Sequence, residues 1–485
     1  MASGAVRRKD SLALAGSRGS GQNRRVASAL RIALVVHGYP PELYGGTECT
    51  VQALARGLAR TGHEPFVIAG TDRHAEPRRV SRSEDRDPES GRSFRVYRIH
   101  RSDLHYGHWT KSRSPHVGRA FEELLDTERP ALVHVHHWVR LTSDLVVRAA
   151  RRKLPGVVTL HDLATTCLVY FRVRPDTRAF CEAPLAPDPC LDCAASVFVA
   201  TPWLSRADQA AVLERGRADV RRELECARAV LALSHDQART LERFLGPIAP
   251  IRVVPPASGS RLAAVDPLPP PDPGRPLVLG CWATLHLLKG TDLLIEAVRL
   301  LGERGVPVEL HLAGIEGNAT YVAGLREQAR GLPVRFHGPF DALPGHAVTR
   351  VHAFVGATRA HETWGVVLDE AIGLRLPMVL PRSGAYAERL REGEGALFFE
   401  PGDARALADV LARLWHEPGL LAGLRARIPS SDTLPRIDDH VRRLVEIYDE
   451  VLRGGAPELG PEDAAQRAAD ESYLAHWDRE CARPR

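Results

Sequence analysis

The hydrophobic positions of this chain follow two patterns that replace each other along the sequence. Residues 31–37 form an apolar run of strand length that stops at a Gly-Tyr-Pro-Pro segment. Apolar residues then recur on one helical face, and this pattern ends at Gly62, as helices commonly do. A second apolar run at residues 66–69 completes a unit of strand, loop, helix and strand.

The same alternation continues to about residue 436. Strands that alternate with helices indicate a parallel sheet whose two faces are both covered, which is the doubly wound α/β class. The further strands are expected at 131–136, 157–160, 229–233, 251–254, 277–279, 308–313, 334–337 and 353–355, with later helices at 292–301 and 366–372.

The clearest boundary is a proline-rich spacer. Six of the ten residues from 267 to 276 are proline, which neither a helix nor a sheet interior tolerates. A chain of 485 residues is also too long for one ordinary core. We therefore predict an N-terminal domain at 30–262, a linker at 263–276 and a C-terminal domain at 277–436. Amphipathic patterns at 437–485 predict terminal helices that cross back to the N-terminal domain.

Charge is concentrated at the start of the chain. The formal net charge is +5, and residues 1–29 are basic, with no sustained period, so we predict a disordered leader. The leader either contacts anionic lipid or is simply solvated. The remainder is nearly neutral, which argues against nucleic acid as a partner. No apolar run reaches membrane-spanning length, so we expect a cytoplasmic protein, with peripheral contact at the inner face of the membrane as the alternative.

Lys289 is the first candidate for chemistry. The chain contains four lysines (Lys9, Lys111, Lys153 and Lys289) against a large excess of arginine. Lys289 precedes Gly290 where a predicted strand gives way to a helix, and a compact cation there suits a phosphate group. The plainer interpretation is a surface lysine at a helix start.

A second candidate site lies at residues 361–371. Gly365 and Val366 mark a helix start, where backbone amides and the helix dipole favour an anion. Glu362 and Glu370, eight residues apart, flank that start and are able to hold hydroxyl groups on either side of the anion. A nucleotide sugar has this order of groups: ribose hydroxyls, diphosphate and sugar hydroxyls. The alternative is a solvated helix with ordinary glutamates.

These motifs, together with Gly-Leu-Arg-Leu-Pro at 373–377 and Gly-Ala-Tyr-Ala-Glu at 384–388, resemble the donor domain of retaining glycosyltransferases of family 4, in the glycogen-synthase-like superfamily. The resemblance covers about residues 31–450. It implies the GT-B fold, in which two Rossmann-like domains face each other across a cleft. It also implies that Lys289 neutralises the diphosphate, Glu370 binds ribose and Glu362 faces the transferred sugar.

The N-terminal half agrees with this resemblance. Gly45 and Gly46 look like the family's glycine loop, whose amides lie over the donor phosphates when the cleft closes. His161, at a predicted strand end, looks like the family's histidine near the donor sugar. The resemblance thus assigns His161, Lys289 and Glu362 to catalysis. The histidines at 134, 136 and 137 also admit interpretation as a metal site, although GT-B enzymes need no catalytic metal.

One position departs from the family pattern. Many members carry an arginine a few residues before the lysine, and here the stretch 283–286 reads Ala-Thr-Leu-His. The charge on the leaving group then depends more on Lys289, the glycine-loop amides and the helix start at Gly365. His286 and Arg382 are candidates for additional help.

Four cysteines, Cys167, Cys181, Cys190 and Cys193, cluster in an insert at 167–193. A Cys-x2-Cys pair with two further thiols suits a tetrahedral structural zinc in a reducing compartment. The alternative is a set of idle or buried thiols, because the long first spacing is not that of a standard zinc finger.

The sequence thus predicts transfer of a hexose from a UDP- or GDP-linked donor, with retention of configuration, to a hydroxyl of a glycan, polysaccharide or lipid-linked acceptor. Catalysis would rest on electrostatic stabilisation of the diphosphate. Two other classes stay open: a GT-B epimerase or phosphorylase, and a non-catalytic protein that binds sugar nucleotides.

Overall fold

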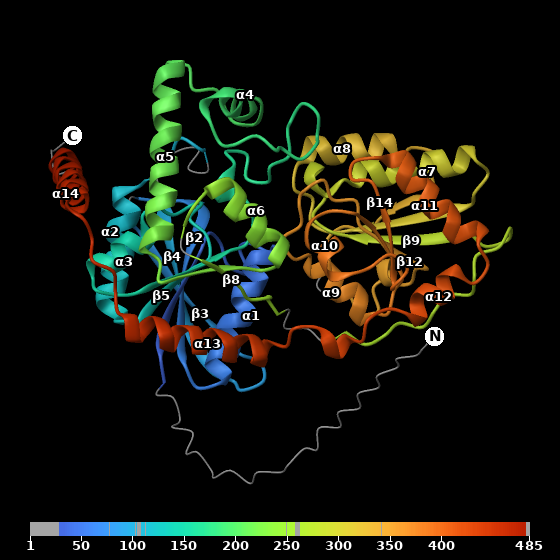
Figure 1. The fold of residues 1–485 in the computed structure, drawn as a ribbon, viewed down its shortest axis with the longest axis horizontal. Coiled ribbons are helices and arrows are strands. Elements are labelled where there is room, and N and C mark those ends of the chain that lie inside the picture. Colours follow the sequence, from blue (N-terminus) through green and yellow to red (C-terminus); the bar gives the residue numbers. More distant parts are fainter. Residues whose placement is uncertain are drawn as a thin grey trace, which may run out of the picture.

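A computed structural model describes residues 29–481 except 77, 102, 104–107, 112, 249, 258–261 and 341. The predicted leader, residues 1–29, lies outside the described residues except for its last position. Two α/β units stand side by side, each with a central sheet covered by helices (Figure 1). Each sheet has its own apolar core on both faces.

The N-terminal unit contains an eight-stranded sheet in the order β3-β4-β2-β1-β5-β6-β7-β8. Every pairing is parallel except that of β3 with β4, which is antiparallel. The strands are β1 (Arg31–Val36), β2 (Glu64–His74), β3 (Val80–Arg86), β4 (Ser93–Arg101), β5 (Leu132–Val135), β6 (Gly156–Leu160), β7 (Ala229–Ala232) and β8 (Ile251–Val253).

Six helices accompany this sheet, and serine caps define where several of them begin. Ser114 Oγ accepts from the amide of Val117, and Ser234 accepts from the amide of Gln237, so orphan amides of the first turn are satisfied. The helices are α1 (Gly46–Arg60), α2 (Pro115–Glu128), α3 (Leu145–Arg151), α4 (Pro187–Val197), α5 (Arg206–Cys226) and α6 (His235–Leu245).

The C-terminal unit contains a six-stranded, fully parallel sheet in the order β11-β10-β9-β12-β13-β14. Its strands are β9 (Leu277–Trp282), β10 (Val308–Ala313), β11 (Val334–Phe336), β12 (Ala353–Val355), β13 (Met378–Pro381) and β14 (Ala396–Phe399). Its helices are α7 (Thr291–Glu303), α8 (Ala319–Gln328), α9 (Val366–Gly373), α10 (Gly384–Arg389), α11 (Ala404–His416) and α12 (Leu420–Ala426).

Helix α13 (Ile437–Gly454) leaves the C-terminal unit and runs beneath the N-terminal one (Figure 1). Its apolar face joins the core between α1 and the sheet. A Cβ atom on Gly57 of α1 would lie 2.8 Å from Val441, so the glycine permits this close approach. At the other end of the contact, Tyr448 Oη lies 2.7 Å from His134 Nδ1.

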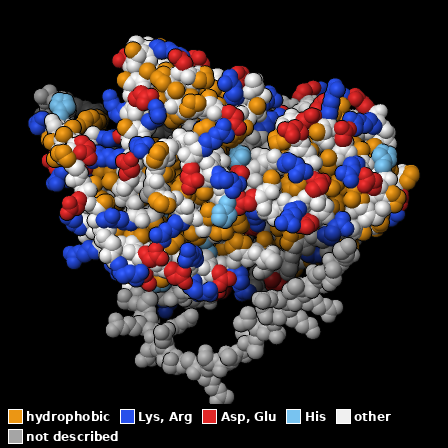
Figure 2. Space-filling view, in the orientation of Figure 1, with side chains coloured by type: hydrophobic (Ala, Val, Ile, Leu, Met, Phe, Trp, Pro, Cys, Tyr) orange, Lys and Arg blue, Asp and Glu red, His pale blue; other side chains and the backbone are white. Residues whose placement is uncertain are grey.

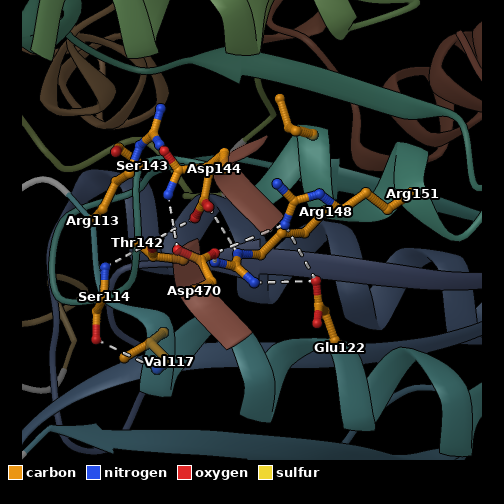
Figure 3. Close-up of polar contacts among 12 residues, drawn as sticks. Arg113, Ser114, Val117, Glu122, Thr142, Ser143, Asp144, Arg148, Arg151 and Asp470 are labelled. Carbon is orange, nitrogen blue, oxygen red and sulfur yellow. Dashed lines mark hydrogen bonds and ion pairs between the residues drawn. The ribbon is translucent and has the colours of Figure 1, made fainter. Parts of the chain in front are cut away.

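Helix α14 (Pro461–Cys481) docks on α2 and α3 through charged side chains. Arg148 is buried and binds Asp144 at 2.9 Å, Glu122 at 3.1 Å and also Asp470 of α14 (Figure 3). Buried ion pairs are stable only when every charge finds a partner, and three carboxylates surround this guanidinium. The two terminal helices therefore belong physically to the N-terminal unit.

The strands expected from apolar runs are all present, with small differences at their ends. The region from 72 to 116 gave no readable pattern, yet it contains β3, β4 and the start of α2. None of the helices with described positions combines the length and apolar character that a membrane crossing requires.

Candidate active site

A cleft of about 390 Å³ lies between the two units, at the carboxyl ends of their strands. This is where doubly wound sheets bind ligands. The N-terminal unit contributes residues after β1 and β6 and at the start of α1, and the C-terminal unit contributes residues after β9 and β12. The polar and glycine residues on its wall include His37, Gly46, Glu48, His161, Asp162, Lys289, Glu362, Thr363 and Gly365.

Lys289 and Glu362 form an ion pair on the C-terminal wall. The distance between Lys289 Nζ and Glu362 Oε1 is 2.6 Å, and the side chains are 39% and 12% exposed. Gly290 turns the chain sharply after the lysine, with φ of 67°, and a Cβ atom there would lie 1.8 Å from the carbonyl oxygen of Ala357. The glycine therefore fixes where Lys289 enters the cleft.

The loop before α9 is held in place by contacts of Trp364 with Asp369 and Arg389. The Trp364 indole donates to Asp369 Oδ2 at 2.9 Å, and Arg389 donates to the carbonyl oxygen of Trp364 at 3.0 Å while its guanidinium lies 3.7 Å over the indole ring. Gly365 has φ of 77°, and a side chain there would collide with Tyr386. Gly365 and Val366, at the start of α9, thus line the cleft from a turn that these contacts hold in place.

Glu370 lies one helical turn further along α9 and is partly buried. Burial raises the pKa of its carboxyl to about 7, and Trp282 opposes that shift by donating its indole N–H to Oε2 at 2.7 Å. Trp282 stands at the end of β9 and also lines the cleft. Sequence reasoning did not identify Trp282, which meets Glu370 through a contact across 88 positions of the chain.

The glycine loop occupies the opposite wall. Gly45 caps α1 and Gly46 is its first residue. A Cβ atom on Gly45 would lie 2.6 Å from Glu48 Oε2, whereas one on Gly46 would meet nothing within 4 Å. Glu48 is buried and accepts from His37 Nε2 at 2.8 Å, a pair that sequence reasoning did not identify.

His161 lies on the same wall and is uncharged. Burial lowers the pKa of its imidazole to about 3, so it is neutral at any working pH. Its Nε2 lies 2.9 Å from His136 Nδ1, and its backbone oxygen accepts from Thr363 of the facing unit at 2.6 Å. The imidazole is therefore a hydrogen-bonding group and not a proton source.

The neighbouring histidines take part in other contacts. His134 uses both ring nitrogens, one with Tyr448 and one with Thr159, each at 2.7 Å. His137 Nε2 lies 3.2 Å from Asp162 Oδ2. Within the described ranges, no three His, Cys, Asp or Glu side chains are arranged to hold a metal ion. The interpretation of 134, 136 and 137 as a metal site is therefore wrong, because both nitrogens of His134 are already engaged.

Further contacts join the two walls behind the cleft. Glu388 of α10 accepts from the amide of His235 at 3.1 Å and from that of Asp236, at the start of α6. His361 in turn binds the Asp236 carboxylate. Predicted site residues of both units, Gly46, His161, Lys289, Glu362, Gly365 and Val366, thus line one cleft, whereas Gly45 and Glu370 are not among its lining residues.

The four insert cysteines carry free thiols in this structure. Cys167, Cys181 and Cys190 lie near Arg172, a buried guanidinium that donates to the carbonyl oxygens of Thr166 at 2.8 Å and Cys181 at 3.0 Å. In the described part of the insert, these thiols and their neighbours form no group of three side chains that could hold a metal ion. The zinc ion stays a prediction.

Comparison with known proteins identifies the family. Residues 44–257 match the model described as Glycosyltransferase Family 4, and residues 276–417 match that of Glycosyl transferases group 1. The chain belongs to glycosyltransferase family 4. The resemblance found in the motifs is confirmed.

Curated relatives of this family 4 chain match over part of their length. D-inositol 3-phosphate glycosyltransferase of Corynebacterium urealyticum is 25% identical over 192 residues, which are 38% of this chain and 45% of that protein. Phosphatidyl-myo-inositol mannosyltransferase of Mycobacterium leprae is 29% identical over 173 residues, 35% of this chain and 45% of that protein. The family 4 chain therefore spans less than half the length of these relatives.

Solved structures confirm the GT-B fold of this family 4 chain. Sucrose-phosphate synthase from Thermosynechococcus elongatus aligns over 88% of this chain and 100% of that one, with a TM-score of 0.60 and 19% identity. The Anabaena protein HepE in complex with UDP and glucose aligns over 87% and 100%, with a TM-score of 0.58 and 16% identity.

The absence of the family's arginine before Lys289 is reflected in the charged residues that line the cleft. Among the described residues that line the cleft, Lys289 is the only lysine or arginine. Arg382 instead binds Glu392 at 2.6 Å, and His286 accepts from the amide of Leu288 within its own turn. The help expected from these two side chains is not present in the observed arrangement.

Proposed function

We propose that this family 4 chain transfers a hexose from a UDP- or GDP-linked donor to an acceptor hydroxyl, with retention of configuration. The observation that carries the proposal is the position of Lys289. It is the single lysine or arginine among the described cleft residues, and it lines the cleft together with Gly365 and Val366 at the start of α9.

Donor binding would divide between the two walls. Lys289 and the amides around Gly365 and Val366 would hold the diphosphate, since a point charge and a helix start both favour an anion. Glu370, oriented by Trp282, would accept hydrogen bonds from the ribose hydroxyls through the oxygen that the indole leaves open. The amides of Gly45 and Gly46 would approach the phosphates from the other side.

The transfer step would then be electrostatic. The bond between the anomeric carbon and the phosphate oxygen breaks, and Lys289 stabilises the charge that develops on that oxygen. The acceptor hydroxyl attacks from the same face and gives its proton to the departing phosphate oxygen, which retains the configuration. Glu362 would face the transferred sugar, and neutral His161 would hold a sugar hydroxyl without exchanging a proton with it.

The names of the relatives support both parts of the proposal. One structural neighbour was solved with UDP and glucose, which supports a nucleotide-linked donor. Two curated relatives are a phosphatidyl-myo-inositol mannosyltransferase and a GDP-mannose:cellobiosyl-diphosphopolyprenol alpha-mannosyltransferase of Komagataeibacter xylinus. These names support a glycan or lipid-linked acceptor for this chain.

Nucleotide release from a panel of donors tests the proposal. The protein is incubated with UDP-glucose, UDP-galactose and GDP-mannose, and proton NMR follows both the free nucleotide and the anomeric signal of the product. Release with a retained anomeric signal is expected for one donor. Donor binding without nucleotide release would favour a non-catalytic binding protein. The absence of the family's arginine before Lys289 is consistent with that alternative. Interconversion of the donor sugar would favour an epimerase.

A further inference from the structure

A row of buried histidine rings lies behind one wall of the donor cleft. His134 is part of β5, His136 follows that strand directly, and His161 directly follows β6. The ring centroids of His134 and His136 are 4.1 Å apart, and those of His136 and His161 are 5.2 Å apart. Of these three histidines, His161 is the one that lines the cleft. The row therefore ends at the donor site.

The other end of the row is anchored to α13. His134 Nδ1 lies 2.7 Å from Tyr448 Oη, and His134 Nε2 lies 2.7 Å from Thr159 Oγ1. The His134 ring therefore cannot rotate without breaking two hydrogen bonds. Because the His136 ring packs on it, with an angle of 35° between the ring planes, the orientation of His136 is restricted as well.

Both of these rings are uncharged. Burial lowers the pKa of His134 and of His136 well below the ordinary value of 6.5, so each imidazole has one N–H and one lone pair. Some histidine side chains reach the surface where the two units adjoin (Figure 2), whereas the exposed fractions of His134 and His136 are 0% and 3%. The hydrogen bonds of these two rings therefore come from protein groups.

The contacts of His136 determine which of its nitrogens carries the hydrogen. His136 Nδ1 lies 2.9 Å from His161 Nε2, and His136 Nε2 is buried without a hydrogen-bond partner among the described residues. Unpaired buried N–H groups are rarer in proteins than unpaired buried acceptors, so the hydrogen belongs on Nδ1. His136 Nδ1 then donates to His161 Nε2. Because His161 is also neutral, its own hydrogen is on Nδ1.

An N–H group on His161 complements the opposite wall of the cleft. His161 Nδ1 is the ring nitrogen that His136 does not use. Glu362, on the opposite wall, only accepts hydrogen bonds while it is ionised, so an N–H group on His161 supplies a donor to the other side of a bound sugar. The backbone of His161 is fixed separately, because its carbonyl oxygen accepts from Thr363 Oγ1 at 2.6 Å.

We propose that His136 is a positioning residue for the transfer reaction: it orients the His161 ring and fixes its hydrogen on Nδ1, so that His161 donates a hydrogen bond to an oxygen of the donor sugar. The inference rests on the proposed function and adds to it the direction of this hydrogen bond and the residue that sets it. Without His136, the His161 ring is free to rotate and to carry its hydrogen on either nitrogen.

NMR spectroscopy of the ligand-free wild type tests the tautomer directly. With isotope-labelled histidine, spectra that correlate the ring nitrogens with the ring C–H protons distinguish the nitrogen that carries hydrogen from the one that does not. The His161→Ala variant identifies the signals of His161. We expect hydrogen on Nδ1 of His161, and hydrogen on Nε2 would overturn the inference. Absent nucleotide release by the wild type with every donor would instead refute the proposed function, without changing this spectrum.

Variants at His136 test its effect on the reaction. His136→Phe keeps a ring against His134 but cannot donate to His161, and kcat/KM for the donor that the wild type uses should fall about tenfold. Its affinity for UDP or GDP, which carry no sugar, should stay unchanged. His136→Asn places an amide donor near the position of Nδ1 and should keep kcat/KM within about threefold of the wild type. His100→Phe, at another buried histidine of the same unit, is the control and should keep both quantities.

A double-mutant cycle separates positioning from a general structural effect. The His136→Phe, His161→Ala double variant should be no slower than His161→Ala alone, because His136 acts only through His161. Additive losses in the double variant would overturn the inference, as would equal losses in His136→Phe and His100→Phe. If His136→Phe does not fold, the same cycle is measured with His136→Leu.

Discussion

Lys289 Nζ lies 2.6 Å from Glu362 Oε1, so the cation proposed for the diphosphate and the carboxylate proposed for the sugar share one wall of the cleft. While Glu362 is ionised, its carboxylate attracts the Lys289 ammonium group and competes with an incoming phosphate for it. A change at Glu362 is therefore expected to alter diphosphate binding by Lys289, and a change at Lys289 is expected to alter the charge that Glu362 presents to the sugar.

Glu362→Gln is expected to separate donor affinity from turnover. Removing a negative charge beside the diphosphate should leave the affinity for UDP or GDP unchanged or tighter. Turnover should fall roughly 10- to 100-fold, because the carboxylate no longer stabilises positive charge that develops on the sugar. Nucleotide titration and release assays measure the two quantities, with Glu394→Gln, an exposed residue, as control. Weaker nucleotide binding with normal turnover would contradict this assignment.

Glu370 is expected to make donor affinity depend on pH. Burial raises the pKa of this carboxyl to about 7, so the group is protonated below that pH and ionised above it. The carboxylate is the better acceptor for ribose hydroxyls, and affinity for UDP or GDP should therefore rise as pH increases through about 7. Glu370→Gln should bind UDP or GDP more weakly, and its nucleotide affinity should no longer rise with pH. An identical pH profile in the variant would exclude Glu370 as its source.

The raised pKa of Glu370 also affects the free energy of unfolding, which should fall as pH rises whereas donor affinity should increase. The folded protein holds a proton on Glu370 that the unfolded chain has released at neutral pH, because the ordinary pKa of a glutamate is 4.5. This group's contribution is fully present below that value and is lost as pH rises through about 7. Denaturant titrations of the wild type and Glu370→Gln at several pH values measure the difference, and parallel curves would contradict it.

The insert is expected to contain about one zinc per chain, bound by Cys167, Cys181, Cys190 and Cys193. Because the metal would be structural, EDTA should not stop catalysis at once. Elemental analysis of protein purified under reducing conditions measures the metal content. Protein without zinc would refute the prediction and leave the four as idle thiols.

The proposed site residues come from both sides of the spacer, so we expect the two units to close further on the donor and bring Gly45, Gly46 and His161 to it. The Gly45→Val, Gly46→Val variant should lose activity, since a Cβ at 45 would lie 2.6 Å from Glu48 Oε2 and one at 46 would stand in the cleft. Small-angle scattering should show a smaller radius of gyration with UDP or GDP. An unchanged radius together with full activity of the variant would exclude closure.

The sequence predicted the parts of this fold that carry a local signal. Buried parallel strands such as β1 and β10 form apolar runs in the sequence, and the proline spacer lies between β8, the last strand of the first sheet, and β9, the first strand of the second. The edge strand β3 was missed because its residues, Val-Ser-Arg-Ser-Glu-Asp-Arg, are mostly polar. Helix α5 was missed because only four of its residues are buried, so its apolar spacing is weak.

The candidate site divides in the same way. Lys289, Glu362 and Glu370 could be proposed from the sequence because their spacing along the chain is itself the signal. Residues that act through contacts between distant segments leave no such signal in the sequence. Trp282 meets Glu370 and His37 meets Glu48 only after strands and helices have packed. The finding that Lys289 is the one lysine or arginine among the described cleft residues also required the structure, because the sequence left Arg382 as a candidate.

Nucleotide release by Lys289→Ala tests the central claim most directly. With the donor that the wild type uses, release is measured for the wild type, for Lys289→Ala and for Lys153→Ala, a control at an exposed lysine. We expect Lys289→Ala to lose at least about 100-fold in turnover, because the described cleft residues then include no lysine or arginine for the leaving diphosphate, while its melting temperature and that of the active control stay unchanged. Turnover of Lys289→Ala equal to that of the wild type would contradict the assignment of the donor site.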